Sequence, residues 1–188
     1  MSRAAFEIQS AFRALMDAMA RPGTIKTLDG AAAPVPLMPA TAALVTSLAD
    51  FETPIWLDPV LRQAPAVVEW VRFTTGAPIT GDAAEASFAL LTDAGTLDFG
   101  AFAQGSEEYP DRSTTVIAQI ARFAGKGFAL SGPGLKELRA FAAEPLPADF
   151  ASRCAANRAL FPRGIDLIFV ASDQIAALPR SVRIAKGD

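Results

Sequence analysis

The chain of 188 residues contains no histidine and only one cysteine, Cys154. Without histidine the protein cannot form a Ser-His-Asp or Cys-His catalytic system, use an imidazole as general base or bind a metal through imidazole. A single cysteine also excludes a disulfide within the chain and a metal site built from several thiolates. These two absences argue against most kinds of self-contained catalysis, and they suit a protein of the reducing cytoplasm.

The cysteine itself lies among alanines, in a stretch at residues 147–160 whose composition predicts a helix. A thiol with no histidine beside it to remove its proton behaves as a small apolar side chain. We therefore expect Cys154 to be inert and the chain to have no catalytic cysteine.

Charged residues make up 20% of the sequence, with a formal net charge of −3, and the arginines are scattered along it. A nucleic-acid-binding protein needs a concentrated basic surface, so this class is excluded. The uncharged run at residues 30–49 is long enough to span a bilayer, but three prolines interrupt it. Charges at Glu7, Arg13 and Asp17 likewise interrupt the start of the chain. We therefore expect neither a signal peptide nor a membrane span.

Apolar residues recur at helical spacing near the N-terminus, around the stretch FRALMDAMARPGTI at residues 12–25. The spacing predicts a helix with one apolar face buried in the core. That face comprises Ile8, Phe12, Leu15, Met16 and Met19. Pro22 and Gly23 then end the helix in a type II turn from Arg21 to Thr24, which leads into a short extended segment at residues 24–28.

Further along the chain, expected helices and strands alternate, which predicts a single α/β domain over residues 1–188 with a mostly covered sheet. Helices are expected from about residue 39, at 65–76, after the Gly-Pro-Gly sequence at 132–134, and at 147–160. Strands are expected at 53–57, 86–91, 113–120, 127–130, 165–171 and 181–185. The strands at 113–120 and 127–130 are expected to be joined through the Gly125-Lys126-Gly127 turn.

Two local patterns have both a chemical and a simpler interpretation. Glycines before a helix, as expected at 132–134, can bind phosphate at the helix N-terminus, but the spacing of a P-loop is absent. We favour a strand-to-helix turn there. The acidic cluster of Glu107, Glu108 and Asp111 has carboxylates suited to acid–base chemistry, but we favour a solvated loop.

The stretch FRALMDAMARPGTI resembles the opening of the H subunit of bacterial carbon–phosphorus lyase, a phosphonate-degrading system. Seven further segments resemble the same family in the order in which the family has them. They are TAALVTSLADFETPIWLD (41–58), WVRFTTGAPI (70–79), ASFALL (86–91), YPDRSTTVIAQI (109–120), LSGPGL (130–135), FPRGIDLIF (161–169) and ALPRS (177–181). The resemblance thus extends over nearly the whole chain.

Two positions depart from the family pattern. Thr74 stands where many relatives carry a histidine, and Ser181-Val182 stands where relatives tend to have two threonines. If a histidine at position 74 performed chemistry in the family, this chain would lack it. We favour the simpler interpretation that neither position is catalytic.

The resemblance implies a subunit of the carbon–phosphorus lyase core complex, which couples ATP to methylphosphonate and forms alpha-D-ribose 1-methylphosphonate 5-triphosphate. A radical iron–sulfur subunit later cleaves the carbon–phosphorus bond. For this chain the resemblance implies a non-catalytic or co-catalytic role without a cofactor, a homodimer, and assembly with the G, I and J subunits in the cytoplasm. It also implies a three-layer α/β/α fold with a mixed sheet, similar to pyridoxal-phosphate-dependent transferases but without their cofactor site.

Two other functions stay open. A stand-alone pyridoxal-phosphate enzyme would need a lysine for a Schiff base, and the chain has Lys26, Lys126, Lys136 and Lys186. With four lysines and no histidine to stack on a pyridine ring, we expect no pyridoxal phosphate. The other alternative is a small domain that binds a phosphonate or a nucleotide.

Three arginines each adjoin a proline in an expected turn: Arg21, Arg163 and Arg180. A turn stiffened by proline presents a guanidinium with less entropy to lose, and a guanidinium suits carboxylates or phosphates. For any single arginine, we favour capping of a nearby carbonyl or exposure to solvent. The sharper hypothesis is that at least one of them anchors a neighbouring subunit or an anionic ligand.

Overall fold

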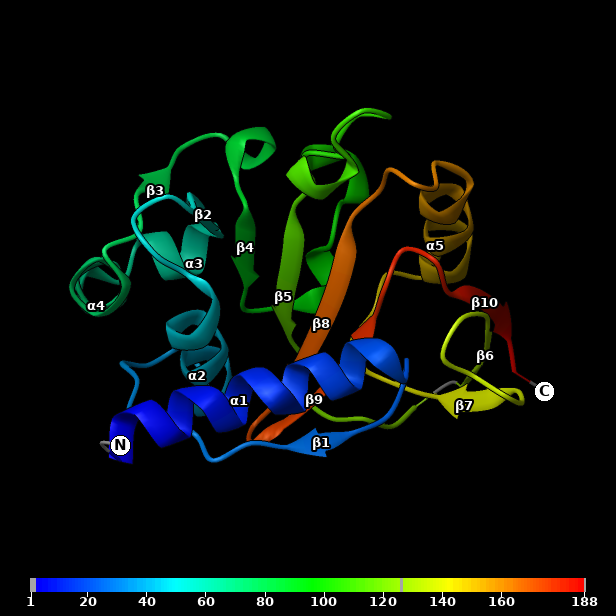
Figure 1. Ribbon diagram of the computed structural model, residues 1–188, viewed down its shortest axis with the longest axis horizontal. Helices are drawn as coiled ribbons and strands as arrows, with labels where there is room; N and C mark the ends of the chain where they lie inside the picture. The colour runs from blue at the N-terminus through cyan, green and yellow to red at the C-terminus, as the bar shows by residue number, and fades with distance from the viewer. Residues whose placement is uncertain (1–2, 126, 188) are drawn as a thin grey trace.

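The computed structural model describes residues 3–125 and 127–187, and its centre is a seven-stranded sheet in the order β1-β9-β8-β5-β4-β2-β3 (Figure 1). Its strands are β1 (Lys26–Thr27), β2 (Ile55–Leu57), β3 (Ile79–Thr80), β4 (Phe88–Leu91), β5 (Thr115–Gln119), β8 (Asp166–Ala171) and β9 (Gln174–Leu178). A smaller sheet has the order β10-β6-β7, with β6 (Phe128–Ser131), β7 (Arg139–Phe141) and β10 (Arg183–Lys186). The helices are α1 (Arg3–Ala20), α2 (Pro39–Leu48), α3 (Pro59–Arg62), α4 (Pro65–Thr75) and α5 (Phe150–Ala159).

The large sheet is mixed. Strands β3, β2, β4, β5 and β8 run parallel to one another. At one edge of the sheet, β9 pairs antiparallel with β8, and β1 pairs antiparallel with β9. Parallel strands in the middle of such a sheet need apolar side chains on both faces. β5 supplies them, with Val116 and Ala118 on one face and Ile117 on the other, all fully buried.

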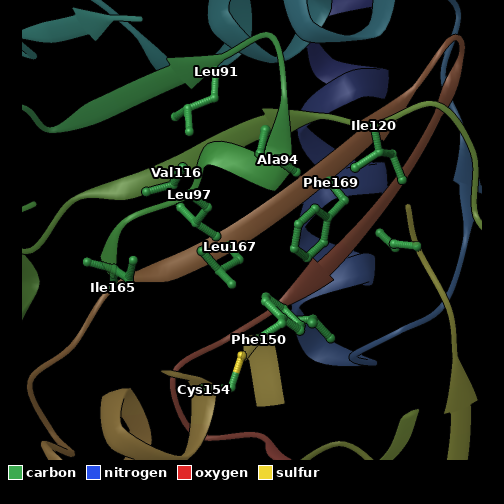
Figure 2. Packing of buried hydrophobic residues seen from close by; sticks show 14 of the residues in the cluster. Leu91, Ala94, Leu97, Val116, Ile120, Phe150, Cys154, Ile165, Leu167 and Phe169 are labelled. Atoms are coloured by element: carbon green, nitrogen blue, oxygen red, sulfur yellow. The ribbon is translucent and has the colours of Figure 1, made fainter. Parts of the chain in front are cut away.

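Two layers cover the faces of this sheet. Ile117 faces the layer that contains α1, α2 and α4. The opposite layer consists of α5, the small sheet and the long connection between β4 and β5. Figure 2 shows this second layer, in which Phe150 and Cys154 of α5 pack near Leu167 and Phe169 of β8. The expected α/β fold with a covered mixed sheet is therefore confirmed.

Most expected elements are present within a few residues of their predicted bounds. Pro65 opens α4, and Gly76 ends it in the left-handed conformation, with a φ of 73°. The turn after α1 also has the predicted form. The N–H of Thr24 donates to the carbonyl of Arg21 at 3.1 Å, and Gly23 has the positive φ of 73° that a type II turn requires.

The buried face of α1 differs from the predicted one. Leu15 is buried as expected, but Ile8, Phe12 and Met16 are exposed. The fully buried Ala18 lies on the inner side instead, where α1 contacts α2 and β9. Small side chains let a helix approach its neighbours closely, so the face that packs is not the face with the largest apolar residues.

The prediction of a helix after the Gly-Pro-Gly sequence is wrong. An irregular segment of turns and bends occupies residues 132–138 and leads into β7, which pairs with β6. Gly134 has a φ of 81°, and a Cβ there would lie 2.1 Å from the carbonyl oxygen of Ala20. The glycine is therefore required by its backbone conformation and by the close approach of the end of α1.

The strands expected at 113–120 and 127–130 exist as β5 and β6, but they belong to different sheets and do not pair. Lys126, in the turn that was expected to join them, lies outside the described residues. In the part of the chain that the structure describes, no helix has the length and apolar character needed to cross a membrane.

Candidate functional site

The chain order reverses between β2 and β4, since β2 leads to β3 on one side and β4 leads to β5 on the other. Open α/β sheets commonly bind ligands beyond the carboxyl ends of the strands at such a point. Here the carboxylate of Asp58, directly after β2, occupies that position. It accepts hydrogen bonds from the N–H of Leu61 at 2.8 Å and from the N–H and Oγ1 of Thr92 at 2.7 and 2.6 Å. Asp58 therefore caps α3 and ties two strand ends together.

Gln119 plays a similar part at the end of β5. Its Oε1 accepts from the N–H of Met38 at 2.6 Å and from Oγ1 of Thr41 at 3.1 Å, and its Nε2 donates to the carbonyl of Pro36 at 3.1 Å. The amide thus holds the segment before α2 against the sheet. Throughout the described residues, no buried side-chain nitrogen or oxygen lacks a hydrogen-bond partner.

A cleft of about 710 Å³ lies in the layer that contains α5 and the small sheet, between α5 and the connection from β4 to β5. This connection contains two short 3-10 helices, η2 (Ala94–Thr96) and η3 (Phe99–Ala101). The cleft lies within the size range of small-molecule sites. Its side chains combine apolar groups with a few polar ones: Leu97, Phe99, Ala156 and Leu160, with Asp98, Gln104, Arg153 and Asn157.

Two polar side chains of this cleft are held by the β4–β5 connection. Arg153 reaches from α5, donating from Nε to the carboxylate of Asp149 at 2.7 Å and from Nη1 to the carbonyl of Leu97 at 2.8 Å. Gln104 donates from Nε2 to the carbonyls of Phe99 and Phe102 at 2.7 and 2.9 Å. Sequence reasoning missed both residues, because their positions depend on contacts between distant segments and no local motif marks them.

Cys154 lies on α5 beside this cleft, with its side chain directed into the core. Burial raises the pKa of its thiol to about 12. A thiol with this pKa stays protonated at neutral pH and is a poor nucleophile. Cys154 is therefore packed in the core like a small apolar residue, as its surroundings in the sequence predict.

Arg180 is the most constrained of the three predicted arginines, because all five of its guanidinium N–H groups have acceptors within the chain. Nε and Nη2 donate to the carboxylate of Asp166 at 3.2 and 2.5 Å, and Nη2 also donates to Oγ of Ser113 at 2.5 Å. Nη1 donates to the carbonyls of Pro110 and Pro162 at 2.8 and 3.3 Å. The side chain is 14% exposed, so it acts as an internal clamp.

Arg163 lies on the turn that this clamp holds, since the carbonyl of its neighbour Pro162 accepts from Arg180. Its own side chain is half-buried and has no hydrogen bond or ion pair with the described residues. Arg21 is not part of this group. It forms an ion pair with Asp17, and Lys26 binds the other oxygen of that carboxylate. The hydrogen bond from Lys26, together with the charge of Arg21, lowers the pKa of Asp17.

The remaining sequence candidates lie apart from the cleft. Lys136 and Lys186 are exposed, and Lys26 is paired with Asp17. Because the Gly-Pro-Gly turn precedes a strand, it presents no helix N-terminus to a phosphate. Glu107, Glu108 and Asp111 are exposed, which confirms the solvated loop. Among the described residues, no group of three or more acidic or cysteine side chains is placed to hold a metal ion.

Comparison with known proteins shows where the chain belongs. The family model described as "Bacterial phosphonate metabolism protein (PhnH)" matches residues 1–185. The alpha-D-ribose 1-methylphosphonate 5-triphosphate synthase subunit PhnH of Rhizobium meliloti (strain 1021) is 43% identical over 184 residues, covering 96% of this chain and 92% of the relative. The putative C-P lyase subunit protein HtxG of Stutzerimonas stutzeri is 28% identical over 178 residues, covering 94% and 85%. The chain belongs to the bacterial phosphonate metabolism protein (PhnH) family.

Proposed function

We propose that the protein is a subunit of the carbon–phosphorus lyase core complex in phosphonate catabolism. In this role it supports formation of alpha-D-ribose 1-methylphosphonate 5-triphosphate from ATP and methylphosphonate, ahead of cleavage of the carbon–phosphorus bond. One observation carries the proposal. The chain is 43% identical to a relative that is named as a subunit of that synthase, and the match covers 92% of the relative's length.

The arrangement of reactive groups favours a non-catalytic or co-catalytic role. The buried carboxylate of Asp58 caps a helix, and the carboxylate of Asp166 is bound by Arg180. The Cys154 thiol is buried with a raised pKa. Because these groups already serve the fold, we assign the bond-making chemistry to other chains of the complex.

We further propose that the chain forms a homodimer, assembles with the G, I and J subunits and works in the cytoplasm. An exposed apolar stripe on α1 supports the homodimer, with Ile8, Phe12 and Met16 at 39%, 44% and 51% exposure. The residues follow at intervals of four, so they form one row along the helix. A twofold axis at Phe12 would place Ile8 of one copy against Met16 of the other.

We also propose that this chain holds no cofactor. Its fold would then be similar to that of pyridoxal-phosphate-dependent transferases but without their cofactor site. A Schiff base needs a lysine inside a ligand cavity. Of the lysines that the structure describes, none lines the 710 Å³ cleft. Adding pyridoxal phosphate and then borohydride should trap no adduct, and a stable adduct on one lysine would favour the stand-alone enzyme instead.

The decisive experiment is genetic and biochemical. Deleting the gene should abolish growth on methylphosphonate as the sole phosphorus source but leave growth on phosphate unchanged, and tagged protein should co-purify with the other core subunits. The isolated chain should consume neither ATP nor methylphosphonate. Turnover by the isolated chain, or normal growth of the deletion strain on methylphosphonate, would contradict the proposal.

A further inference from the structure

The cleft beside α5 is lined by two polar side chains that are fixed by one short segment of the chain. The carbonyls of Leu97 and Phe99 hold Arg153 and Gln104, at 2.8 and 2.7 Å respectively. These carbonyls are two residues apart on one short segment. The two side chains, one from α5 and one from the β4–β5 connection, are therefore positioned against the same part of the cleft lining.

Each of these side chains keeps hydrogen-bonding capacity for a ligand. Both amide hydrogens of Gln104 are used on backbone carbonyls, which fixes the amide orientation, because the opposite one would place Oε1 against two carbonyl oxygens. Oε1 thus stays as an acceptor, with no donor among the described residues. Arg153 uses Nε and one N–H of Nη1, so three of its five N–H groups have no acceptor among the described residues.

The charge of the cleft does not suit a small, highly charged anion. The guanidinium of Arg153 is already paired with Asp149, and the carboxylate of Asp98 also lines the cleft. Apolar side chains such as Leu97 and Leu160 make up much of the remaining lining. These features fit a neutral, largely apolar ligand with an edge that accepts hydrogen bonds from Arg153 and donates one to Gln104.

We propose that this cleft binds a neutral purine base, free or as part of a nucleoside. A purine is flat and apolar on its faces, and its edge carries ring-nitrogen acceptors next to N–H donors. The assignment to adenine in particular rests on the proposed function. Converting ATP into a ribose 1-phosphonate breaks the bond between ribose C1′ and adenine N9, a phosphonate oxygen bonds to C1′, and adenine leaves with the proton that the phosphonate gives up.

Two alanines on the exposed side of α5 provide a matched test. Ala156 lines the cleft, whereas its neighbour Ala155 does not, and both are exposed. Ala156→Trp should fill the cleft without removing any of the hydrogen bonds described above, and Ala155→Trp adds the same bulk outside it. Because both positions are exposed, we expect neither substitution to disturb the fold, and thermal melts should verify that both variants fold.

The measurement is a calorimetric titration of the isolated chain with adenine, adenosine, inorganic phosphate and methylphosphonate. Wild type and Ala155→Trp should bind adenine and adenosine saturably, and Ala156→Trp should bind them at least about tenfold more weakly. Phosphate and methylphosphonate should not compete with adenine. Absence of saturable purine binding to the wild type, or unchanged binding by Ala156→Trp, would overturn the proposal.

Failure of this proposal is distinguishable from failure of the proposed function. The titration uses the isolated chain, whereas the proposed function is tested by co-purification and growth. Purine binding without co-purification would refute the subunit role but support the cleft as a purine site. Co-purification without purine binding would refute the cleft proposal alone.

Discussion

Arg180 and Asp166 are joined by three hydrogen bonds where β9 ends and β8 begins. The backbone N–H and Nε of Arg180 donate to Oδ1 of Asp166 at 2.8 and 3.2 Å, and Nη2 donates to Oδ2 at 2.5 Å. Both side chains are about 15% exposed. In this environment, charge-assisted hydrogen bonds are much less weakened by water than on an open surface.

Replacing Arg180 by alanine should therefore destabilise the fold substantially. The change leaves the Asp166 carboxylate without its counter-charge, and we expect a loss of about 2–3 kcal/mol, below the range for fully buried pairs because both groups keep some contact with water. Urea unfolding measures it. Arg163→Ala is the control and should change stability by less than about 0.5 kcal/mol. Equal unfolding midpoints for Arg180→Ala and the wild type would show that the clamp contributes nothing.

Asp58→Ala should be costly for a different reason. It removes the acceptor for the N–H of Leu61 in the first turn of α3 and for two donors of Thr92, and we expect a loss of about 2–4 kcal/mol in the free energy of unfolding. Asp93 also caps a helix, through the N–H of Gly95, but it is exposed. Asp93→Ala should therefore cost less than about 1 kcal/mol. Equal losses in the two variants would refute the role of burial.

Stability should fall with rising pH because of Cys154. An unfolded cysteine titrates near pH 8.5, whereas burial raises the pKa of Cys154 to about 12. Between these values the unfolded chain gives up a proton that the folded chain retains, so raising the pH favours unfolding, by about 2 kcal/mol at pH 10. Cys154→Ala lacks this titration and should lose less stability between about pH 8 and pH 10. Parallel pH profiles from urea unfolding would contradict the assignment.

Phe12→Glu should convert the proposed homodimer into a monomer, because the twofold axis would bring two carboxylates together in an apolar contact. Light scattering over a range of concentrations measures the mass. Ser10→Glu is the control, since a residue two positions away lies about 200° around the helix, and it should stay dimeric. A dimeric Phe12→Glu would place the interface elsewhere on the surface.

The sequence predicted those helices and strands that are marked by a pattern within their own residues. The apolar run before Ala171 predicted β8, and Pro65 with Gly76 predicted α4. β9 carries two alanines in its five residues, and its apolar signal was too weak to predict a strand, although it is almost entirely buried. Its pairing with β8 places it in the sheet, and a tertiary contact of this kind leaves no periodic pattern.

The face of α1 and the candidate cleft were missed for a related reason. Hydrophobic spacing ranks faces by side-chain size, whereas α1 packs with Ala18 inward and Phe12 outward. Gln104 and Arg153 line the same cleft only because α5 and the β4–β5 connection cover the same face of the sheet. Both outcomes depend on distant segments of the chain.

The Arg180 clamp also bears on the rate at which the protein unfolds. The contact between Arg180 and Pro110 joins residues 70 positions apart, so we expect it to form only after β5, β8 and β9 have come together. Contacts between segments so distant in sequence require a long loop to close first, and those absent from the folding transition state act mainly on the unfolding rate. The clamp should therefore prolong the lifetime of the folded chain and leave its folding rate nearly unchanged.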